Sequence, residues 1–396
     1  MQPRVVRDIE EVELLSEEEK KKLKRVTDKY TFYTNDYYLG LIDPDDKNDP
    51  IRKIIIPSLS ELEDGGAVDP SNEKKYTQRK GLEHKYGPTA LILASRACGG
   101  ICRFCFRKRI FMNNNTEAIP DLRSAVEYIQ EHKEINNVLI TGGDPLILPT
   151  SYLDQLLSDL FEIDHIRFVR IGSKIPVYNP YRILDDKELL QVLSRYNEGD
   201  KRFYLITDIN HPKELTDTSV RAIKALRDVG VIMSNQTPLL KGINDDPLIL
   251  SELMNQLSAI GVTPYYVFQC RPTVGNVSFS IPIERGYTIF EETKKYTSGL
   301  AKRSRFIMSH KTGKIEIIGL TGDKILFKYH NAAEKENESR VMIFRRNPEA
   351  HWLDDYDEMI ETYSLSDETE LDTSQRSLYE YLDSKSRSQE EMESRT

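Results

Sequence analysis

The sequence contains no long hydrophobic run. Its apolar stretches, such as residues 90–94 and 138–140, are far shorter than the roughly 20 residues of a membrane-spanning helix. Residues 1–26 are charged throughout and lack the apolar segment of a secretory signal. We therefore expect a cytoplasmic protein.

An excess of positive charge is also lacking. The 396 residues include 64 acidic and 55 basic side chains, for a formal net charge of −9. This balance disfavours general binding to nucleic-acid backbones or anionic membranes. With 39% hydrophobic and 30% charged residues, the chain can form a core. The length allows two to three domains, or one large α/β domain with extensions.

Cysteine is scarce, and the four present are too few for a disulfide framework. Three of them are clustered at Cys98, Cys102 and Cys105, which favours a metal centre over three inert buried thiols. A structural zinc site would need a fourth ligand. An iron–sulfur cluster held by three thiolates would keep one iron open for an external ligand. The fourth cysteine, Cys270, is expected to be a small buried residue at a strand end.

From residue 90 onward, short apolar runs alternate with amphipathic helical patterns. The expected strands are 90–95, 137–143, 166–173, 203–208, 231–236 and 264–270. The expected helices are 121–133, 151–161, 186–196, 213–229, 247–260 and 287–300. Repeated β-α-β units predict a parallel sheet, either a partial barrel or a doubly wound sheet. In both folds the functional residues collect at the carboxyl ends of the strands.

The flanking segments differ in composition. Residues 1–85 are polar and favour helix, with a loop-rich stretch at 64–72. Residues 313–332 favour β-structure, with a hairpin signal at 321–323. Residues 366–396 form a polar, acidic tail that we expect to be disordered.

The CxxxCxxC loop after the first expected strand is similar to that of the radical S-adenosylmethionine enzymes. Over residues 85–330 the sequence further resembles the lysine 2,3-aminomutase family, closer to glutamate 2,3-aminomutase in its substrate-site charge. The resemblance is carried by KYGPTALILASRACGGICRFCFRKR, VLITGGDPLIL, VRIGSKIPVYNPYRI, ITDINHPKEL, SNQTPLLKGIND and PYYVFQCRP, in family order. It implies an α/β fold with a partial (βα)6 radical S-adenosylmethionine barrel over 86–305. A helical extension, 1–85, would precede the barrel, and a β-rich segment with the cofactor lysine, 306–365, would follow it.

The resemblance also implies an activity and its cofactors. The enzyme would be an isomerase that moves the α-amino group of an amino acid to the β carbon. It would use a 4Fe-4S cluster, S-adenosylmethionine and pyridoxal 5′-phosphate, with flavodoxin or ferredoxin as a possible electron donor. The lysine enzymes bind zinc through C-terminal cysteines at a subunit contact. Because no cysteine follows Cys270, we expect no zinc, and a homo-oligomer stays an open alternative.

The family motifs then assign roles to individual residues. The cluster ligands would be Cys98, Cys102 and Cys105. S-adenosylmethionine would be bound by Gly142, Gly143, Asp144, Arg170 and Ser173. A plain β-turn or an ordinary strand–loop junction is the structural alternative for these last residues.

Basic residues complete the implied site. Arg107 matches the arginine that binds the substrate carboxylate, a role that suits a planar guanidinium. The alternative is a solvated basic face at residues 107–109. Lys314 would form the Schiff base with pyridoxal phosphate, unless it is an ordinary hairpin lysine. Lys85, which precedes a tyrosine, would neutralise the cofactor phosphate.

The sequence departs from the lysine enzymes at Arg271, where the family has an aspartate that holds the distal ammonium of lysine. The second aspartate of that site falls near Met308 or Ser309. Two like charges about 4 Å apart repel by about 4 kcal/mol at an effective dielectric of about 20. Arg271, helped by His310 or Lys311, would instead suit a distal carboxylate, so we expect glutamate or another amino acid than lysine.

Two other functions remain compatible with these motifs. The chain could be a related radical enzyme that acts on a protein lysine or has lost the pyridoxal reaction. It could also be a non-enzymatic iron–sulfur carrier or sensor, which would need no S-adenosylmethionine.

Overall fold

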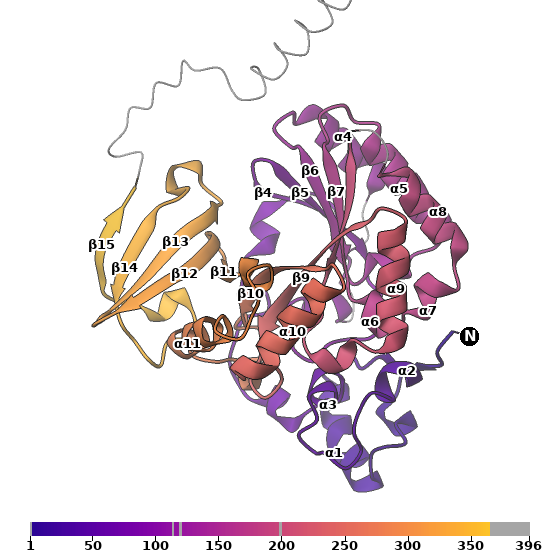
Figure 1. Ribbon diagram of the computed structural model, residues 1–396, viewed down its shortest axis with the longest axis horizontal. Helices are drawn as coiled ribbons and strands as arrows, with labels where there is room; N and C mark the ends of the chain where they lie inside the picture. Colours follow the sequence, from indigo (N-terminus) through magenta and orange to yellow (C-terminus); the bar gives the residue numbers. More distant parts are fainter. Residues whose placement is uncertain (1, 113–114, 119–120, 198–199, 365–396) are drawn as a thin grey trace, which may run out of the picture.

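One large β-sheet organises the molecule. The structure is a computed structural model that describes residues 2–112, 115–118, 121–197 and 200–364. Within these ranges, thirteen strands form one sheet in which every strand pairs with its sequence neighbours (Figure 1). The strands are β3 (Thr77–Arg79), β4 (Leu82–Tyr86), β5 (Thr89–Ser95), β6 (Asn137–Gly142), β7 (Phe168–Ser173), β8 (Arg202–Thr207), β9 (Ile232–Leu239), β10 (Thr263–Gln269), β11 (Arg305–His310), β12 (Gly313–Thr321), β13 (Lys324–Ala332), β14 (Val341–Arg345) and β15 (Met359–Tyr363).

Strands β5 to β11 are parallel, and their spatial order follows the sequence without reversal. A doubly wound sheet requires a reversal of strand order. The expected partial barrel is therefore confirmed, and its six strands coincide with β5 to β10. Strand β11 is a further parallel strand that the sequence pattern did not predict.

Helices in the crossovers cover the outer face of the barrel (Figure 1). They are α4 (Leu122–Glu131), α5 (Thr150–Phe161), α6 (Ile175–Tyr178), α7 (Tyr181–Leu184), α8 (Lys187–Arg195), α9 (Asp217–Asp228), α10 (Pro247–Ala259) and α11 (Ile283–Thr293). Alternation along β6 shows how the sequence separates core from cavity. Val138 and Ile140 pack into the hydrophobic core, whereas Leu139 and Thr141 line the barrel interior.

The N-terminal segment is only partly helical. It contains α1 (Glu17–Thr27), α2 (Asp36–Leu39) and α3 (Pro50–Ile55), together with a small sheet of β1 (Val5–Val6) and β2 (Thr34–Asn35). These helices lie below the barrel in Figure 1. Against the helical expectation, β3 and β4 form an antiparallel hairpin that continues onto β5. Both strands are short and polar, which hid them in the sequence.

The C-terminal strands extend the sheet beyond the barrel. The expected hairpin is confirmed, because β12 and β13 are antiparallel and meet at Thr321 and Lys324. Strands β14 and β15 continue the sheet and form the yellow edge in Figure 1. The expected disordered tail, 366–396, lies outside the described residues.

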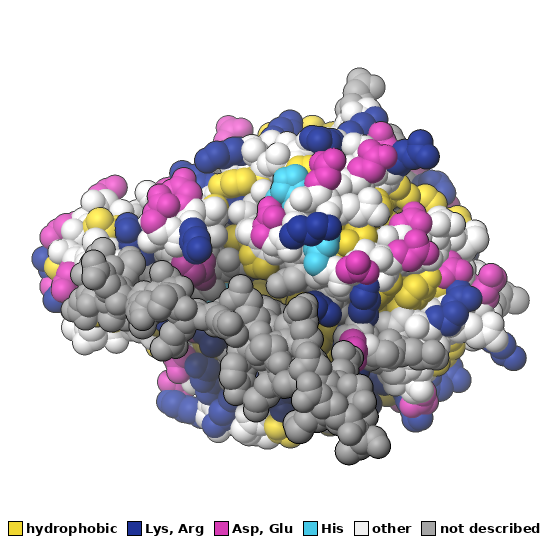
Figure 2. All heavy atoms as spheres, turned by 90° about the horizontal axis from the view of Figure 1, so that it is seen from above, with side chains coloured by type: hydrophobic (Ala, Val, Ile, Leu, Met, Phe, Trp, Pro, Cys, Tyr) yellow, Lys and Arg dark blue, Asp and Glu magenta, His cyan; other side chains and the backbone are white. Residues whose placement is uncertain are grey.

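The described part of the chain contains no helix with the length and hydropathy needed to cross a membrane. On the face shown in Figure 2, acidic and basic side chains are interspersed and do not form one basic field.

Candidate active site

A cavity of about 550 Å³ lies at the carboxyl ends of the barrel strands. Its wall includes the three clustered cysteines, the glycines after β6 and residues from β7 to β12. All residues that the sequence assigned to the site line this one cavity, except His310 and Lys311. The barrel topology explains this convergence, because parallel strands place the loops that follow them at one end of the sheet.

The cysteine loop begins directly after β5, where the Ser95 hydroxyl accepts a hydrogen bond from the Ala97 amide at 3.0 Å. Cys98, Cys102 and Cys105 are free thiols, and burial raises the pKa of all three. No three cysteine, histidine or acidic side chains of the described chain surround a single metal ion. A cluster has another requirement, because each thiolate binds a different iron. Three unpaired thiols on one cavity wall fit that donor set.

Two glycines dock the end of β6 against the cysteine loop. The amide of Gly143 donates to the Ser95 carbonyl at 2.6 Å, and the Asp144 amide donates to the Ala97 carbonyl at 2.7 Å. A Cβ on Gly143 would lie 2.3 Å from the Ala97 oxygen. Gly142 has a φ of +121°, which disfavours any side chain. These glycines therefore let two backbones meet beside the cavity.

Asp144 is held by backbone amides. Its carboxylate accepts hydrogen bonds from the amides of Lys174 at 2.8 Å and Leu146 at 3.1 Å. Burial raises its pKa to about 6. On the neighbouring strand β7, Ser173 accepts from the Ile175 amide, and Arg170 Nη2 donates to Asn137 Oδ1 at 2.7 Å. Arg170 and Ser173 thus face the same cavity wall as Asp144.

Arg107 is buried and held by a carboxylate that the sequence analysis missed. Its Nε and Nη2 atoms donate to Glu73 at 3.2 and 2.9 Å, and its Nη1 donates to Thr141 Oγ1 at 3.0 Å. A guanidinium has five N–H groups, so two remain for a ligand. Because Arg109 also donates to Glu73, at 2.6 Å, a solvated basic face is excluded.

Arg271 lies on the same aromatic ring as Arg107. The Arg271 guanidinium carbon is 3.6 Å from the centroid of Phe106, and that of Arg107 is 4.7 Å from it. Arg271 Nη1 is buried without a hydrogen-bond partner among the described residues, and its contact with Glu73 is long, at 3.9 Å. Burial lowers the Arg271 pKa to about 10. An incompletely paired cation therefore faces the cavity.

Lys314 projects from β12 into the cavity over Tyr266 and Phe268, with its Nζ 5.5 and 4.8 Å from their ring centroids. Within the described chain it makes no ion pair. Burial, reinforced by the charges of Arg271 and other cations, lowers its pKa to about 7. A large fraction of this amine is therefore neutral and nucleophilic near pH 7.

Lys85 lies on the opposite edge of the barrel sheet, on β4. Its Nζ donates to the His310 carbonyl at 2.8 Å and lies 5.0 Å from the Tyr76 ring centroid. Burial lowers its pKa to about 8. Lys85 and Lys314 both line the cavity. Besides burial, the charge of Arg271 lowers the pKa of both amines, and the charge of Lys85 further lowers that of Lys314.

The expected help from His310 and Lys311 is wrong. Alternation along β11 places Ser309 in the cavity and turns His310 to the other face. Both His310 and Lys311 contact Asp354, at 3.3 and 3.0 Å. Both side chains therefore have an acidic partner outside the cavity.

Three acidic residues of the cavity were not predicted: Glu73 and Glu83 in the N-terminal segment, and Asp208, which directly follows β8. Glu73 is in the 3-10 helix Glu73–Tyr76, and Glu83 is on β4. Arg107, Arg109 and Arg271 hold the Glu73 pKa well below its usual range, despite burial. Burial and the Glu73 charge raise the pKa of Glu83 to about 8. At neutral pH Glu83 therefore adds little negative charge to offset Arg271.

Comparison with known proteins identifies several relatives. Residues 92–251 match the model of the radical SAM superfamily. The protein named "Putative L-lysine 2,3-aminomutase" from Aquifex aeolicus (strain VF5) is 52% identical over 360 residues, covering 91% of this chain and 96% of that protein. L-lysine 2,3-aminomutase from Clostridium subterminale is 39% identical over 66% of this chain and 62% of its own. Glutamate 2,3-aminomutase from Clostridioides difficile (strain 630) is 36% identical over 76% of this chain and 70% of its own.

Proposed function

Because the chain belongs to the lysine 2,3-aminomutase family, a family of isomerases among the radical S-adenosylmethionine enzymes, we propose a reaction for it. The chain moves the α-amino group of a dicarboxylic amino acid to the β carbon, and glutamate is the leading substrate. One hydrogen moves from the β to the α carbon in exchange. The product is an isomer of the substrate, so no atom is gained or lost.

The donor sets of the cavity fit the three cofactors of the family. Cys98, Cys102 and Cys105 would hold the 4Fe-4S cluster, and the wall formed by Gly142, Gly143, Asp144, Arg170 and Ser173 would bind S-adenosylmethionine. Lys314 would bind pyridoxal phosphate, with Lys85 against its phosphate. When bound, these groups supply the radical that removes hydrogen and the conjugated carbonyl that carries the migrating nitrogen.

The protein's own contribution is placement. The two free N–H groups of Arg107 suit the α-carboxylate, while Glu73 and Thr141 fix the orientation of its guanidinium. Arg271 would bind the distal carboxylate, supported by the Phe106 ring that both arginines contact. Holding both ends of the substrate fixes the reacting carbons relative to Lys314.

The observation that carries the proposal is the shared cavity. It collects three unpaired thiols, a buried amine with a pKa near 7 and an incompletely paired arginine. Glu73 is already shared by three arginines, and the raised pKa of Glu83 keeps that side chain protonated near pH 7. Neither glutamate therefore offers a free ionised carboxylate to a distal ammonium beside Arg271.

The substrate test is an anaerobic assay of the reconstituted protein against an amino-acid panel with β-amino product detection. We expect β-glutamate, with lysine turning over more slowly. Faster lysine turnover would refute the dicarboxylate substrate but keep the aminomutase. An absence of every β-amino product, while S-adenosylmethionine is cleaved, would refute the aminomutase itself.

The role of Lys314 can be tested without turnover. Borohydride treatment of the protein loaded with pyridoxal phosphate, followed by peptide mass spectrometry, should locate a phosphopyridoxyl group on Lys314. The Lys314→Met variant should lose it. Lys311→Met is the matched control, because Lys311 is half exposed and lies outside the cavity. Labelling elsewhere, unaffected by Lys314→Met, would contradict the assignment.

A further inference from the structure

The buried ring of Tyr178 packs against the cysteine loop. Tyr178 is at the end of α6 and is 1% exposed. A Cβ on Gly100 would lie 2.0 Å from Tyr178 Cε1 and 2.6 Å from its Cζ. The Gly99–Gly100 pair therefore leaves the space that this ring occupies between Cys98 and Cys102.

The Tyr178 hydroxyl is an orphan. It is buried and has no hydrogen-bond partner among the described residues, although burying an unsatisfied hydroxyl is unfavourable. A phenol has a pKa of about 10, so this hydroxyl is a protonated donor at neutral pH. Tyr178 belongs to the buried cluster of side chains against which Cys102 packs. A thiol is a weak acceptor, whereas a thiolate bound to iron is a much better one.

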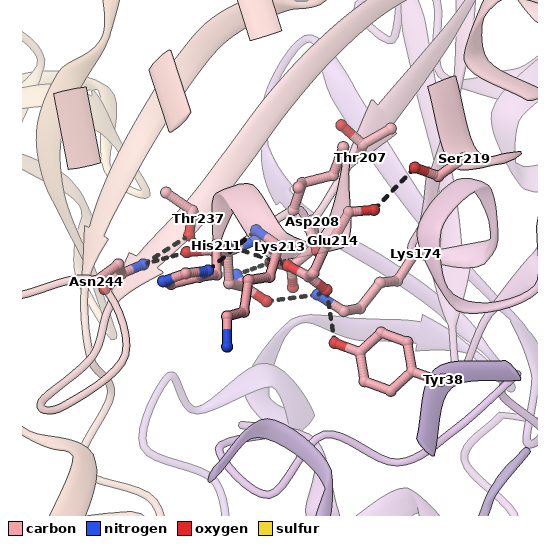
Figure 3. Close-up of polar contacts among 12 residues, drawn as sticks. Tyr38, Lys174, Thr207, Asp208, His211, Lys213, Glu214, Ser219, Thr237 and Asn244 are labelled. Carbon is pink, nitrogen blue, oxygen red and sulfur yellow. Dashed lines mark hydrogen bonds and ion pairs between the residues drawn. The ribbon is translucent and has the colours of Figure 1, made fainter. Parts of the chain in front are cut away.

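Tyr38 and a polar network hold the Tyr178 ring in place. Its ring stacks on Tyr38, with ring centroids 4.0 Å apart. The Tyr38 hydroxyl donates to Glu214 Oε1 at 2.7 Å, and the same oxygen lies 2.6 Å from Lys174 Nζ. Figure 3 shows these three side chains converging. The Asn35 side-chain Nδ2 donates to the backbone carbonyls of Gly99 and Tyr178, at 3.3 and 3.0 Å. Asn35 thereby ties the loop to α6.

We propose that Tyr178 is a positioning residue for the iron–sulfur cluster, whose hydroxyl donates a hydrogen bond to the Cys102 thiolate and raises the reduction potential of the cluster. A hydrogen bond to a ligand sulfur withdraws electron density and stabilises the reduced cluster. The Tyr38–Glu214–Lys174 network holds the ring so that the donor needs no reorganisation on reduction. This inference rests on the proposed binding of the cluster by the three cysteines.

The test measures the cluster directly. Redox titration of the anaerobically reconstituted full chain, followed by electron paramagnetic resonance, gives the midpoint potential without any turnover. Tyr178→Phe keeps the ring and removes only the donor, so we expect a shift to a more negative potential. We also expect faster loss of iron to a chelator. Tyr181→Phe is the control, because Tyr181 lies three residues away and outside the cavity wall.

The outcomes separate the two proposals. A wild-type chain that takes up no iron would refute the proposed cluster site. A normal cluster whose potential is the same in wild type, Tyr178→Phe and Tyr181→Phe would overturn the role of Tyr178 alone. Folded Tyr178→Phe protein that cannot retain iron, while Tyr181→Phe does, would support that role. Circular dichroism verifies folding of both variants.

Discussion

The Glu73 carboxylate holds the Arg107 guanidinium through two hydrogen bonds, of 2.9 and 3.2 Å, across 34 residues of sequence. The side chains are 10% and 8% exposed. This buried pair joins the N-terminal segment to the cysteine loop, two residues beyond Cys105. The orientation of the proposed substrate arginine therefore depends on a residue outside the barrel motifs.

Glu73→Gln should destabilise the protein. The substitution leaves Arg107, Arg109 and Arg271 without their shared carboxylate, and breaking a buried ion pair costs about 3–5 kcal/mol. We expect a loss of this order in urea unfolding at pH 7, together with a raised KM. Glu63→Gln, at an exposed position of the same segment, is the control.

The effect of Glu73→Gln should also depend on pH. The folded-state pKa of Glu73 is depressed below the usual 4.5, so its stabilisation is present above pH 4.5 and is lost as pH falls further. The stability gap between wild type and Glu73→Gln should therefore narrow below pH 4.5. A gap that is constant down to pH 3 would contradict the ion pair as its source.

Lys314→Met should stabilise the cofactor-free protein, with the opposite pH dependence. The folded-state pKa of Lys314 is about 7 against 10.5 in the unfolded chain, so stability rises with pH between these values. The stabilisation by Lys314→Met should be largest at pH 7 and below. Between pH 7 and 10.5 it should shrink by about 1.4 kcal/mol per pH unit.

Urea unfolding at several pH values measures this difference. Lys311→Met is the control, because the Lys311 side chain is 50% exposed, and its effect should be small throughout. A stabilisation by Lys314→Met that does not change with pH would show that the buried charge is not its cause.

The parallel strands were predictable because each is an apolar run bounded by a helical pattern, as in β6, where Val138 and Ile140 are fully buried. Strand β11 was missed, although Phe306 and Ile307 are buried, because only residues 311 and 312 separate it from β12. Strand alternation also explains why the predicted role of His310 in the substrate site was wrong. Its neighbour Ser309 faces the cavity, so His310 cannot.

The family motifs placed the cysteines, Asp144 and Lys314 in one cavity. The cysteines and Asp144 follow the neighbouring strands β5 and β6, whereas Lys314 lies on β12. Spacing carried no information on Glu73, whose partner Arg107 is 34 residues away. The only signal for it was indirect. Three consecutive basic residues, 107–109, next to a metal loop require a buried counter-charge if they face inward.

Gly143→Ala should distort the contact between β6 and the cysteine loop. The added Cβ would lie 2.3 Å from the Ala97 carbonyl oxygen, which is backbone and cannot rotate away. We expect about 1–3 kcal/mol of destabilisation and weaker S-adenosylmethionine binding by calorimetry. Gly87→Ala is the control, because a Cβ there meets nothing within 4 Å. Equal effects of the two substitutions would refute the packing argument.

Arg271→Gln should change the substrate preference. Truncating one partner of a buried charge pair costs about 2–5 kcal/mol, so kcat/KM for glutamate should fall about 30-fold or more. Lysine should gain relative to glutamate, because a cation next to its distal ammonium is gone. Arg305→Gln is the matched control, since Arg305 is 51% exposed on β11 and lies outside the cavity. If Arg271→Gln lowers the rates for glutamate and lysine by the same factor, Arg271 does not contact the distal group.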